Sequence, residues 1–377
     1  MSGVISDNTV RSSGAVAPLS SATLDAGNPA ADTNPTDGIG TKWINTTSGV
    51  IFVCSDATSN DNTWVGQTDF GPRIGGKAVF MMGQYTASGN TQSVDVFTID
   101  TLGNATDLGD MPSPALYAVA GSDNGTLGRA VAFGGSDGSY KNTISYITID
   151  TLGNGASFGT FDTGVYSPGA CSNGPNDRAV KCGGVSGPWV YQNSMQYVTV
   201  STTGDASDQA DLSFANFGMS GTSNGTNDRG LLAMGSGKIA IDYFTINTQA
   251  NAVDFGDVTN AAYCGAFSNG TNERACFAGG STTGTGGNSI SYVTMTSTGN
   301  GTSFGTLSIL TDWTTATSSG SVGDRGLISL GQDYTGGFQG RVKTVEYVTI
   351  SSPSNAADFG DCTDLRASCA AGNNAMT

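Results

Sequence analysis

The chain has 377 residues, of which 31 are acidic and 15 basic, so its formal charge is −16, and it contains no histidine. The lack of imidazole excludes Ser-His-Asp triads, histidine-liganded zinc and histidine general bases. The acidic balance argues against nucleic acid as a partner. The sequence contains no apolar run of 18 residues and no secretory signal pattern, so neither a membrane-spanning helix nor a signal peptide is expected. Glycine accounts for 56 residues, about twice the usual ~7% share, which indicates many turns between short elements.

The first seventy residues have two different compositions. Residues 1–40 are rich in Ser, Ala, Asn, Pro and Gly and lack periodicity, which predicts an extended arm. Residues 41–70 predict a small β-hairpin module, with strands at 42–45 and 50–54 and a third strand around Trp64. A hairpin this small is marginal alone. We therefore expect Trp43, Phe52 and Trp64 to form a mini-core that needs a partner surface or a symmetric homo-oligomer, although plain core packing explains the same aromatics.

A repeat dominates the rest of the chain, residues 74–377. Six segments begin with a basic residue and carry a glycine six positions later: KAVFMMG, RAVAFGG, RAVKCGG, RGLLAMG, RACFAGG and RGLISLG. Each is followed by an alternating strand that ends in Thr and an apolar residue, then by a short element such as ATDLGD or AVDFGD, and then by a small-residue strand. Four short strands in about 50 residues are typical of one blade of a β-propeller. The sequence therefore predicts an all-β, six-bladed propeller.

The two ends of the repeat region complement each other. The first copy begins at residue 74 without a small-residue strand before it, whereas DLRASCAAGNN near the C-terminus resembles the missing strand. We expect residues 367–371 to supply the innermost strand of the first blade and so to leave no sheet edge exposed.

The acid-Arg pairs that precede most copies invite a catalytic interpretation. They recur once per blade, however, so the preferred interpretation is that each Arg ties an inter-blade turn by bonding to backbone carbonyls. A sialidase-like enzyme would show Asp-box turns, and the nearest approach, SDNG at 122–125, lacks the required spacing. The sequence predicts no catalytic residue, cofactor or metal site, although calcium at the Asp-rich turn 56–62 stays open. The seven cysteines, without a CxxC pair, are expected to be free buried thiols.

The length of one connection per blade varies. From the repeat glycine to the Thr landmark the distances are 15, 13, 15, 10, 14 and 18 residues, while the remainder of each blade is nearly constant. Equivalent loops of a propeller emerge on one side, so these loops should form one variable face. Aromatic residues in them are the candidate interaction residues, by stacking on sugars or by protein contacts: Tyr85, Tyr140, Trp189, Tyr191, Tyr334 and Phe338.

Two resemblances add to this interpretation. The Gly-Gly doublets followed by Tyr resemble kelch-type propellers, without the kelch Trp. Strings such as IDYFTIN, GNATDLGD and SNGTNDR, and the module GTKWINTTSGVIFVCSDATSNDNTW, resemble tailed-phage virion and tail-fibre proteins. That resemblance implies a non-enzymatic structural or appendage protein of the virion, assembled in the cytoplasm of the host bacterium and attached to other virion proteins through residues 1–70. The alternative is a propeller that binds a host-surface glycan or receptor.

Overall fold

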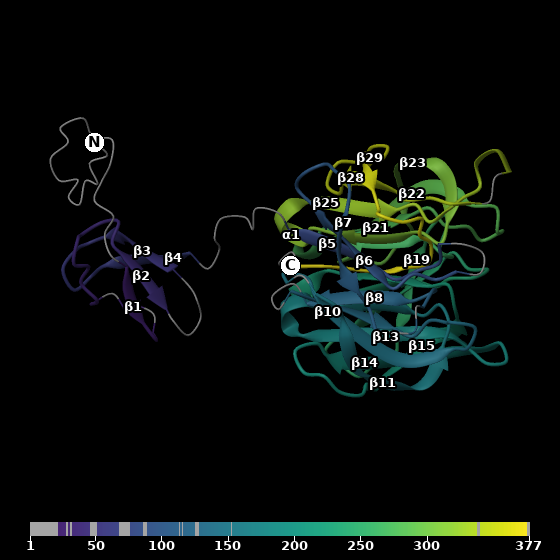
Figure 1. The fold of residues 1–377 in the computed structure, drawn as a ribbon, viewed down its shortest axis with the longest axis horizontal. Helices are drawn as coiled ribbons and strands as arrows, with labels where there is room; N and C mark the ends of the chain where they lie inside the picture. The colour runs from purple at the N-terminus through teal and green to yellow at the C-terminus, as the bar shows by residue number, and fades with distance from the viewer. Residues whose placement is uncertain are drawn as a thin grey trace. The chain divides into compact units, whose positions relative to one another are not determined.

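The structure is a computed structural model of the chain. It describes residues 22–27, 29–30, 32–45, 51–67, 76–85, 89–112, 114, 116–124, 128–151, 153–337 and 340–374. The chain divides into two compact units, Met1–Ile74 and Gly75–Thr377 (Figure 1). Among the described residues, no helix combines the length and the apolar character needed to span a membrane.

The N-terminal unit contains one four-stranded sheet. Its order is β1-β2-β3-β4, with β1 parallel to β2 and the other pairs antiparallel. The strands are β1 (Thr23–Asp25), β2 (Lys42–Asn45), β3 (Ile51–Asp56) and β4 (Thr63–Gln67). Strand β1 lies inside the stretch predicted as an extended arm, because its partner β2 is distant in sequence and local composition carries no signal for such pairing. The turn expected at 46–49 lies outside the described residues.

The described part of the C-terminal unit contains six antiparallel sheets, which we number in the order of their second strands. Sheet 1 consists of β30 (Ala370–Asn373), β5 (Lys77–Met81), β6 (Ser93–Thr98) and β7 (Thr106–Asp110). Sheet 2 consists of β8 (Ala120–Asn124), β9 (Arg129–Phe133), β10 (Lys141–Thr148) and β11 (Ala156–Val165). Sheet 3 consists of β12 (Gly169–Ser172), β13 (Arg178–Ser186), β14 (Val190–Thr199) and β15 (Ser207–Asn216).

The other three sheets follow the same pattern, with one addition. Sheet 4 consists of β16 (Ser220–Ser223), β17 (Arg229–Ala233), β18 (Ala240–Thr245) and β19 (Val253–Asp257). Sheet 5 consists of β20 (Gly265–Ser268), β21 (Arg274–Ala278), β22 (Gly287–Thr294) and β23 (Thr302–Asp312). Sheet 6 consists of β24 (Thr315–Ser318), β25 (Arg325–Ser329), β28 (Thr344–Thr349) and β29 (Ala357–Asp361). The long connection of sheet 6 forms β26 (Gln332–Asp333) and β27 (Gly340–Arg341), and β26 pairs with β23 of sheet 5.

Short helical turns connect the first and second strands of four sheets. They are η1 (Gly174–Asn176), η2 (Gly225–Asn227), η3 (Gly270–Asn272) and α1 (Gly320–Gly323), and η4 (Thr335–Gly337) lies between β26 and β27. In η1 to η3 an Asn side chain before the turn accepts a hydrogen bond from the backbone N–H of the Arg that begins the next strand, as Asn173 does from Arg178 at 2.8 Å. This bond explains the recurring string in which Asn precedes Arg by five positions.

The hydrophobic core lies between successive sheets in six clusters. One contains Val79 and Val94 of sheet 1 together with Ala130 and Ile147 of sheet 2. The others join sheets 2 and 3, 3 and 4, 4 and 5, 5 and 6, and finally 6 and 1. Both faces of each sheet are therefore covered, which accounts for strands that are apolar on both sides.

The first strands of the six sheets contact one another in a cycle. Strand β8 contacts β12, and the contacts continue through β16, β20, β24 and β30 back to β8. Small residues make this approach sterically feasible. A Cβ atom on Gly121 of β8 would lie 2.3 Å from backbone atoms of Ala371, and one on Gly221 would lie 2.3 Å from the carbonyl oxygen of Ala170. The small-residue strands of the sequence repeat are therefore the strands that meet in this cycle.

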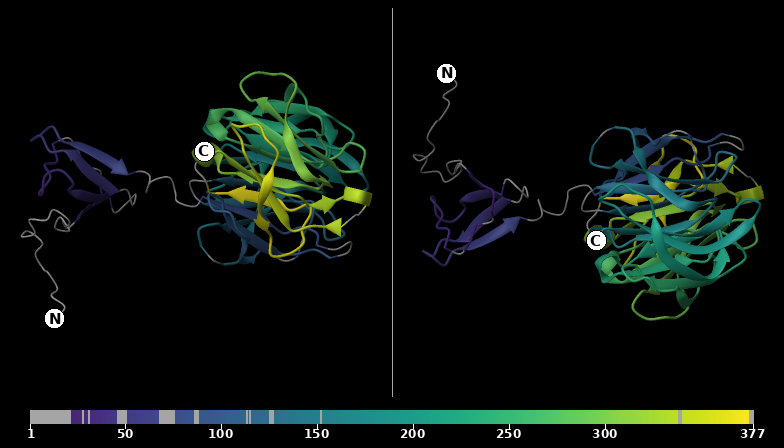
Figure 2. Two further views of the ribbon diagram at one scale, coloured as in Figure 1. Left: turned by 90° about the horizontal axis from the view of Figure 1, so that it is seen from above. Right: turned by 90° about the horizontal axis from the view of Figure 1, so that it is seen from below.

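Sheet 1 combines strands from the two ends of the repeat region. Strand β30 pairs with β5, with Ala370 opposite Met81 and Asn373 opposite Ala78, and the yellow C-terminal strand lies beside blue strands in Figure 2. The expected partner is confirmed, although the strand begins at Ala370 and only an isolated bridge joins Ala367 to Gln84.

The basic residue that begins each second strand bonds to the following sheet. Arg129 donates to the carbonyl of Val200 at 2.8 Å, Arg274 to that of Ile350 at 2.9 Å, and Arg325 to that of Ile99 at 2.7 Å. Equivalent bonds start from Lys77, Arg178 and Arg229. The structural interpretation of these residues is confirmed. Their acidic neighbours have a structural partner too, as when Asp228 accepts a hydrogen bond from Asn173 of the preceding sheet at 2.8 Å.

Candidate functional site

A ring of backbone hydrogen bonds surrounds the place where the first strands converge. Six residues, each two positions before a first strand, are linked in a cycle by N–H to carbonyl bonds of 2.9 to 3.1 Å, with the N–H of Thr314 substituting for that of Trp313. All six have left-handed backbone conformations, with φ between 52° and 70°. We call them the axial ring: Ala118, Ser167, Gly218, Tyr263, Trp313 and Ser368.

Aromatic side chains gather at this ring. The centroids of Tyr263 and Trp313 lie 4.0 Å apart. Tyr166 contacts Trp313 at 6.1 Å and Phe217 at 6.4 Å, and Phe217 contacts Tyr191 at 5.1 Å. These and similar contacts join eight residues, which we call the aromatic cluster: Tyr117, Tyr140, Tyr166, Trp189, Tyr191, Phe217, Tyr263 and Trp313.

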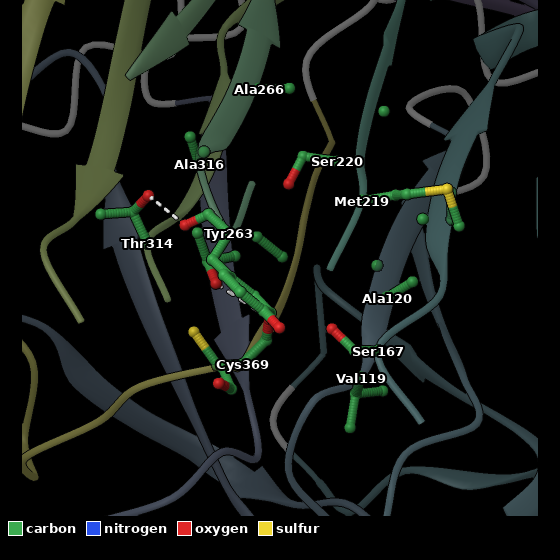
Figure 3. Close-up of a pocket in the computed structure, with 18 of the residues that line it drawn as sticks. Val119, Ala120, Ser167, Met219, Ser220, Tyr263, Ala266, Thr314, Ala316 and Cys369 are labelled. Atoms are coloured by element: carbon green, nitrogen blue, oxygen red, sulfur yellow. Dashed lines mark hydrogen bonds between the residues drawn. The ribbon is translucent and has the colours of Figure 1, made fainter. Parts of the chain in front are cut away.

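The axial ring borders a cavity of about 80 Å³. Ser167, Tyr263 and Trp313 line its ring end, and residues of the first strands form its wall (Figure 3). The dashed line beside the Thr314 label in Figure 3 marks the bond from the Thr314 hydroxyl to the Tyr263 carbonyl, at 3.2 Å. A second cavity of about 70 Å³ is lined by later residues of the same strands, including Asp123 and Asn373.

Asp312 places a carboxyl group among these rings. It is only 3% exposed, and its Oδ1 atom has no hydrogen-bond partner among the described residues. Burial raises the pKa of Asp312 to about 6, although a hydrogen bond with Tyr334 and the charge of Arg341 act in the opposite direction. Burial also raises the pKa of Tyr263 to about 12, and the charge of Asp312 adds to that shift. A buried acceptor without a donor destabilises the folded state, so this carboxyl group is unusual among the buried polar groups.

The structure brings together some of the aromatics predicted from the variable loops. Tyr140, Trp189 and Tyr191 belong to the aromatic cluster, and Trp189 and Tyr191 are 64% and 49% exposed. Tyr334 is partly buried and bonds to Asp312. Tyr85 is 43% exposed and has no ring contact with the cluster among the described residues. Phe338 lies outside the described residues.

The three aromatics predicted for the attachment module lie on one sheet. Trp43 pairs with Phe52 across β2 and β3, and Cys54 pairs with Trp64 across β3 and β4, so register places all four on one face. The two indole rings meet edge to face at 6.1 Å. Trp43, Phe52 and Trp64 are all partly exposed, whereas Cys54 is buried.

Sequence reasoning missed five members of the aromatic cluster. Local composition does not single these residues out, but their position in the repeat does. Each lies two or three residues before a small-residue strand: Tyr117, Tyr166, Phe217, Tyr263 and Trp313. Asp312 was missed too. At the place three residues before the first strand the other sheets have Tyr117, Tyr166, Phe217, Ala262 and Ala367, so a carboxyl group occurs there once.

Other chemistry-bearing residues have structural partners. All seven cysteines are buried free thiols, as expected. Asp56 accepts hydrogen bonds from the backbone and hydroxyl of Thr58, at 2.9 and 2.7 Å. Among the described residues, no group of three or more acidic or cysteine side chains is placed to hold a metal ion.

Comparison with known proteins adds no family. No family profile matches the sequence, and no curated protein is significantly similar to it.

Proposed function

We propose that this chain is a non-enzymatic virion component of a tailed phage, in which a six-bladed β-propeller is displayed through the N-terminal module. The cycle of contacts among six first strands carries the fold part of this proposal, because a radial arrangement buries both faces of every sheet. The acid-Arg pairs, the strongest sequence candidates for catalysis, bond between sheets at repeated positions. The virion part rests on the resemblance of the repeat and module strings to phage proteins.

The N-terminal unit suits attachment. Its sheet has four strands, and its largest aromatic side chains, Trp43, Phe52 and Trp64, stay partly exposed on one face. A sheet of this size gains stability by covering such a face with a partner. Other virion proteins, or further copies of this chain in a symmetric homo-oligomer, are the proposed partners, and assembly would take place in the host cytoplasm.

A second candidate function is recognition of a receptor on the host surface. The aromatic cluster favours it, because Trp189 and Tyr191 expose large apolar rings next to partly exposed axial rings. Contiguous aromatic surface on a folded unit is typical of interaction sites.

Deletion of the attachment module tests the display role. The virus that encodes the chain is assembled with a variant lacking residues 1–74, and purified particles are examined by immunoblot for the propeller. We expect the variant to accumulate in infected cells and to be absent from particles, while a full-length Trp313→Ser control is incorporated. Incorporation of the shortened chain at the normal copy number would refute attachment through this module.

A further inference from the structure

The aromatic side chains of the axial ring are not needed for its backbone geometry. Ala118, Ser167, Gly218 and Ser368 adopt the same left-handed conformation as Tyr263 and Trp313, and their N–H groups donate to ring carbonyls as that of Tyr263 does. Bulky residues rarely adopt this conformation, and each instance costs on the order of 1–3 kcal/mol. The fold therefore holds two large rings in strained conformations at positions where small residues close the ring equally well.

These rings are joined by edge-to-face and tilted contacts, and a buried carboxyl group lies near them. Tyr263 and Trp313 contact each other and, through Tyr166 and Phe217, the exposed rings Trp189 and Tyr191. Asp312 precedes Trp313 directly, and its charge acts on the hydroxyl groups of both Tyr166 and Tyr263. Arg341, whose Nε atom also lacks a partner, lies near the same carboxyl group.

We infer that the aromatic cluster and Asp312 form a binding site for a neutral saccharide. The negative faces of aromatic rings attract the weakly positive C–H groups on one face of a sugar ring. A sugar hydroxyl that displaces the side chains covering Asp312 would donate to its buried, unpaired Oδ1 atom, removing the cost of an acceptor without a donor. The formal charge of −16 disfavours anionic polysaccharides by repulsion.

This inference rests on the proposed receptor-binding role and gives that role a ligand class and a site. Few polar groups among many apolar ones are typical of small-molecule sites, where the polar groups set specificity. Asp312 and the hydroxyl groups of Tyr166 and Tyr263 would select among sugars, while the rings provide most of the contact area.

The test uses the full chain and a glycan array printed with neutral and anionic bacterial polysaccharides. Neutral oligosaccharides from bound array members are then titrated against the protein by tryptophan fluorescence. Tyr263→Ser and Trp313→Ser introduce the residue type found at Ser167 and Ser368, so these variants should keep the fold. We expect each to weaken binding about tenfold or more, the effect of losing roughly 1.4 kcal/mol.

Two further variants sharpen the result. Asp312→Asn keeps the shape of the side chain but removes the charge, and it should weaken binding and change the preference among sugars. Leu102→Ala removes an exposed apolar side chain outside the cluster and should bind as the unmodified chain does. Circular dichroism and melting temperature confirm folding of every variant.

The outcomes separate the site from the wider role. Saccharide binding that survives both serine substitutions would overturn the site and leave the receptor-binding role intact. Binding to host cells without binding to any array polysaccharide would overturn the saccharide class in favour of a protein receptor. Binding to neither would overturn the receptor-binding role itself.

Discussion

Removing the cation of Arg366 is expected to destabilise the C-terminal unit strongly. Arg366 lies just before β30, is fully buried, and forms an ion pair of 3.1 Å with Asp95 of β6, which is equally buried. Its guanidinium also donates to the backbone carbonyls of Phe80 and Met82 at 2.9 and 3.0 Å. Arg366→Met leaves the Asp95 carboxylate buried without its counter-charge, which costs about 3–5 kcal/mol.

Chemical denaturation followed by near-UV circular dichroism measures this loss. Arg129→Met is the matched control, because Arg129 bonds to the neighbouring sheet through the carbonyls of Val200 and Ser201 and, among the residues that the structure describes, forms no ion pair with a buried carboxylate. The double substitution Asp95→Asn with Arg366→Met should recover part of the loss, since it removes both charges. A loss below about 1 kcal/mol for Arg366→Met would show that the pair does not tie β30 to sheet 1.

Three other changes test the packing and the electrostatics. A chain ending at Leu365 lacks β30, so it exposes the edge of β5, loses the contacts of β30 with β8, and should aggregate or melt at a much lower temperature. An unchanged melting temperature would refute closure by this strand. Gly221→Ala should destabilise the unit by about 1–3 kcal/mol because its Cβ would meet a backbone carbonyl at 2.3 Å, whereas Gly204→Ala, with open space around it, should be nearly neutral in the same denaturation assay. Burial raises the pKa of Asp123 to about 7, so its ionisation should lower the free energy of unfolding as pH rises from about 4 to 7. Asp123→Asn should remove this pH dependence and be the more stable chain at pH 8. Equal pH dependence of the free energy of unfolding in both chains would contradict this.

The repeat carried most of the predictable information about the fold. The regular spacing of basic residue, glycine and Thr defines second and third strands, because these elements are local and alternate clearly. The pairing of β30 with β5 was also predictable, since the C-terminal strand resembles the first strands of the other sheets. Strands β1 and β26 were not, because each pairs through a contact that depends on tertiary structure rather than on local sequence.

The candidate site was only partly visible in the sequence. Length variation pointed to Tyr140, Trp189 and Tyr191, but their contacts with Tyr166 and Phe217 arise only when distant segments converge. The burial of Asp312 has the same origin, because an Asp at the end of a strand is usually solvated. A repeat-by-repeat comparison of the position three residues before each first strand would have singled it out.

Mass spectrometry of purified particles tests the central functional claim most directly. Particles of the phage proposed to encode this chain are purified by density gradient, digested and quantified against a major capsid protein. The account predicts peptides from both the N-terminal module and the propeller at a fixed ratio to that capsid protein in independent preparations. Abundant polypeptide in the infected-cell lysate, with none in the particles, would contradict a role in the virion.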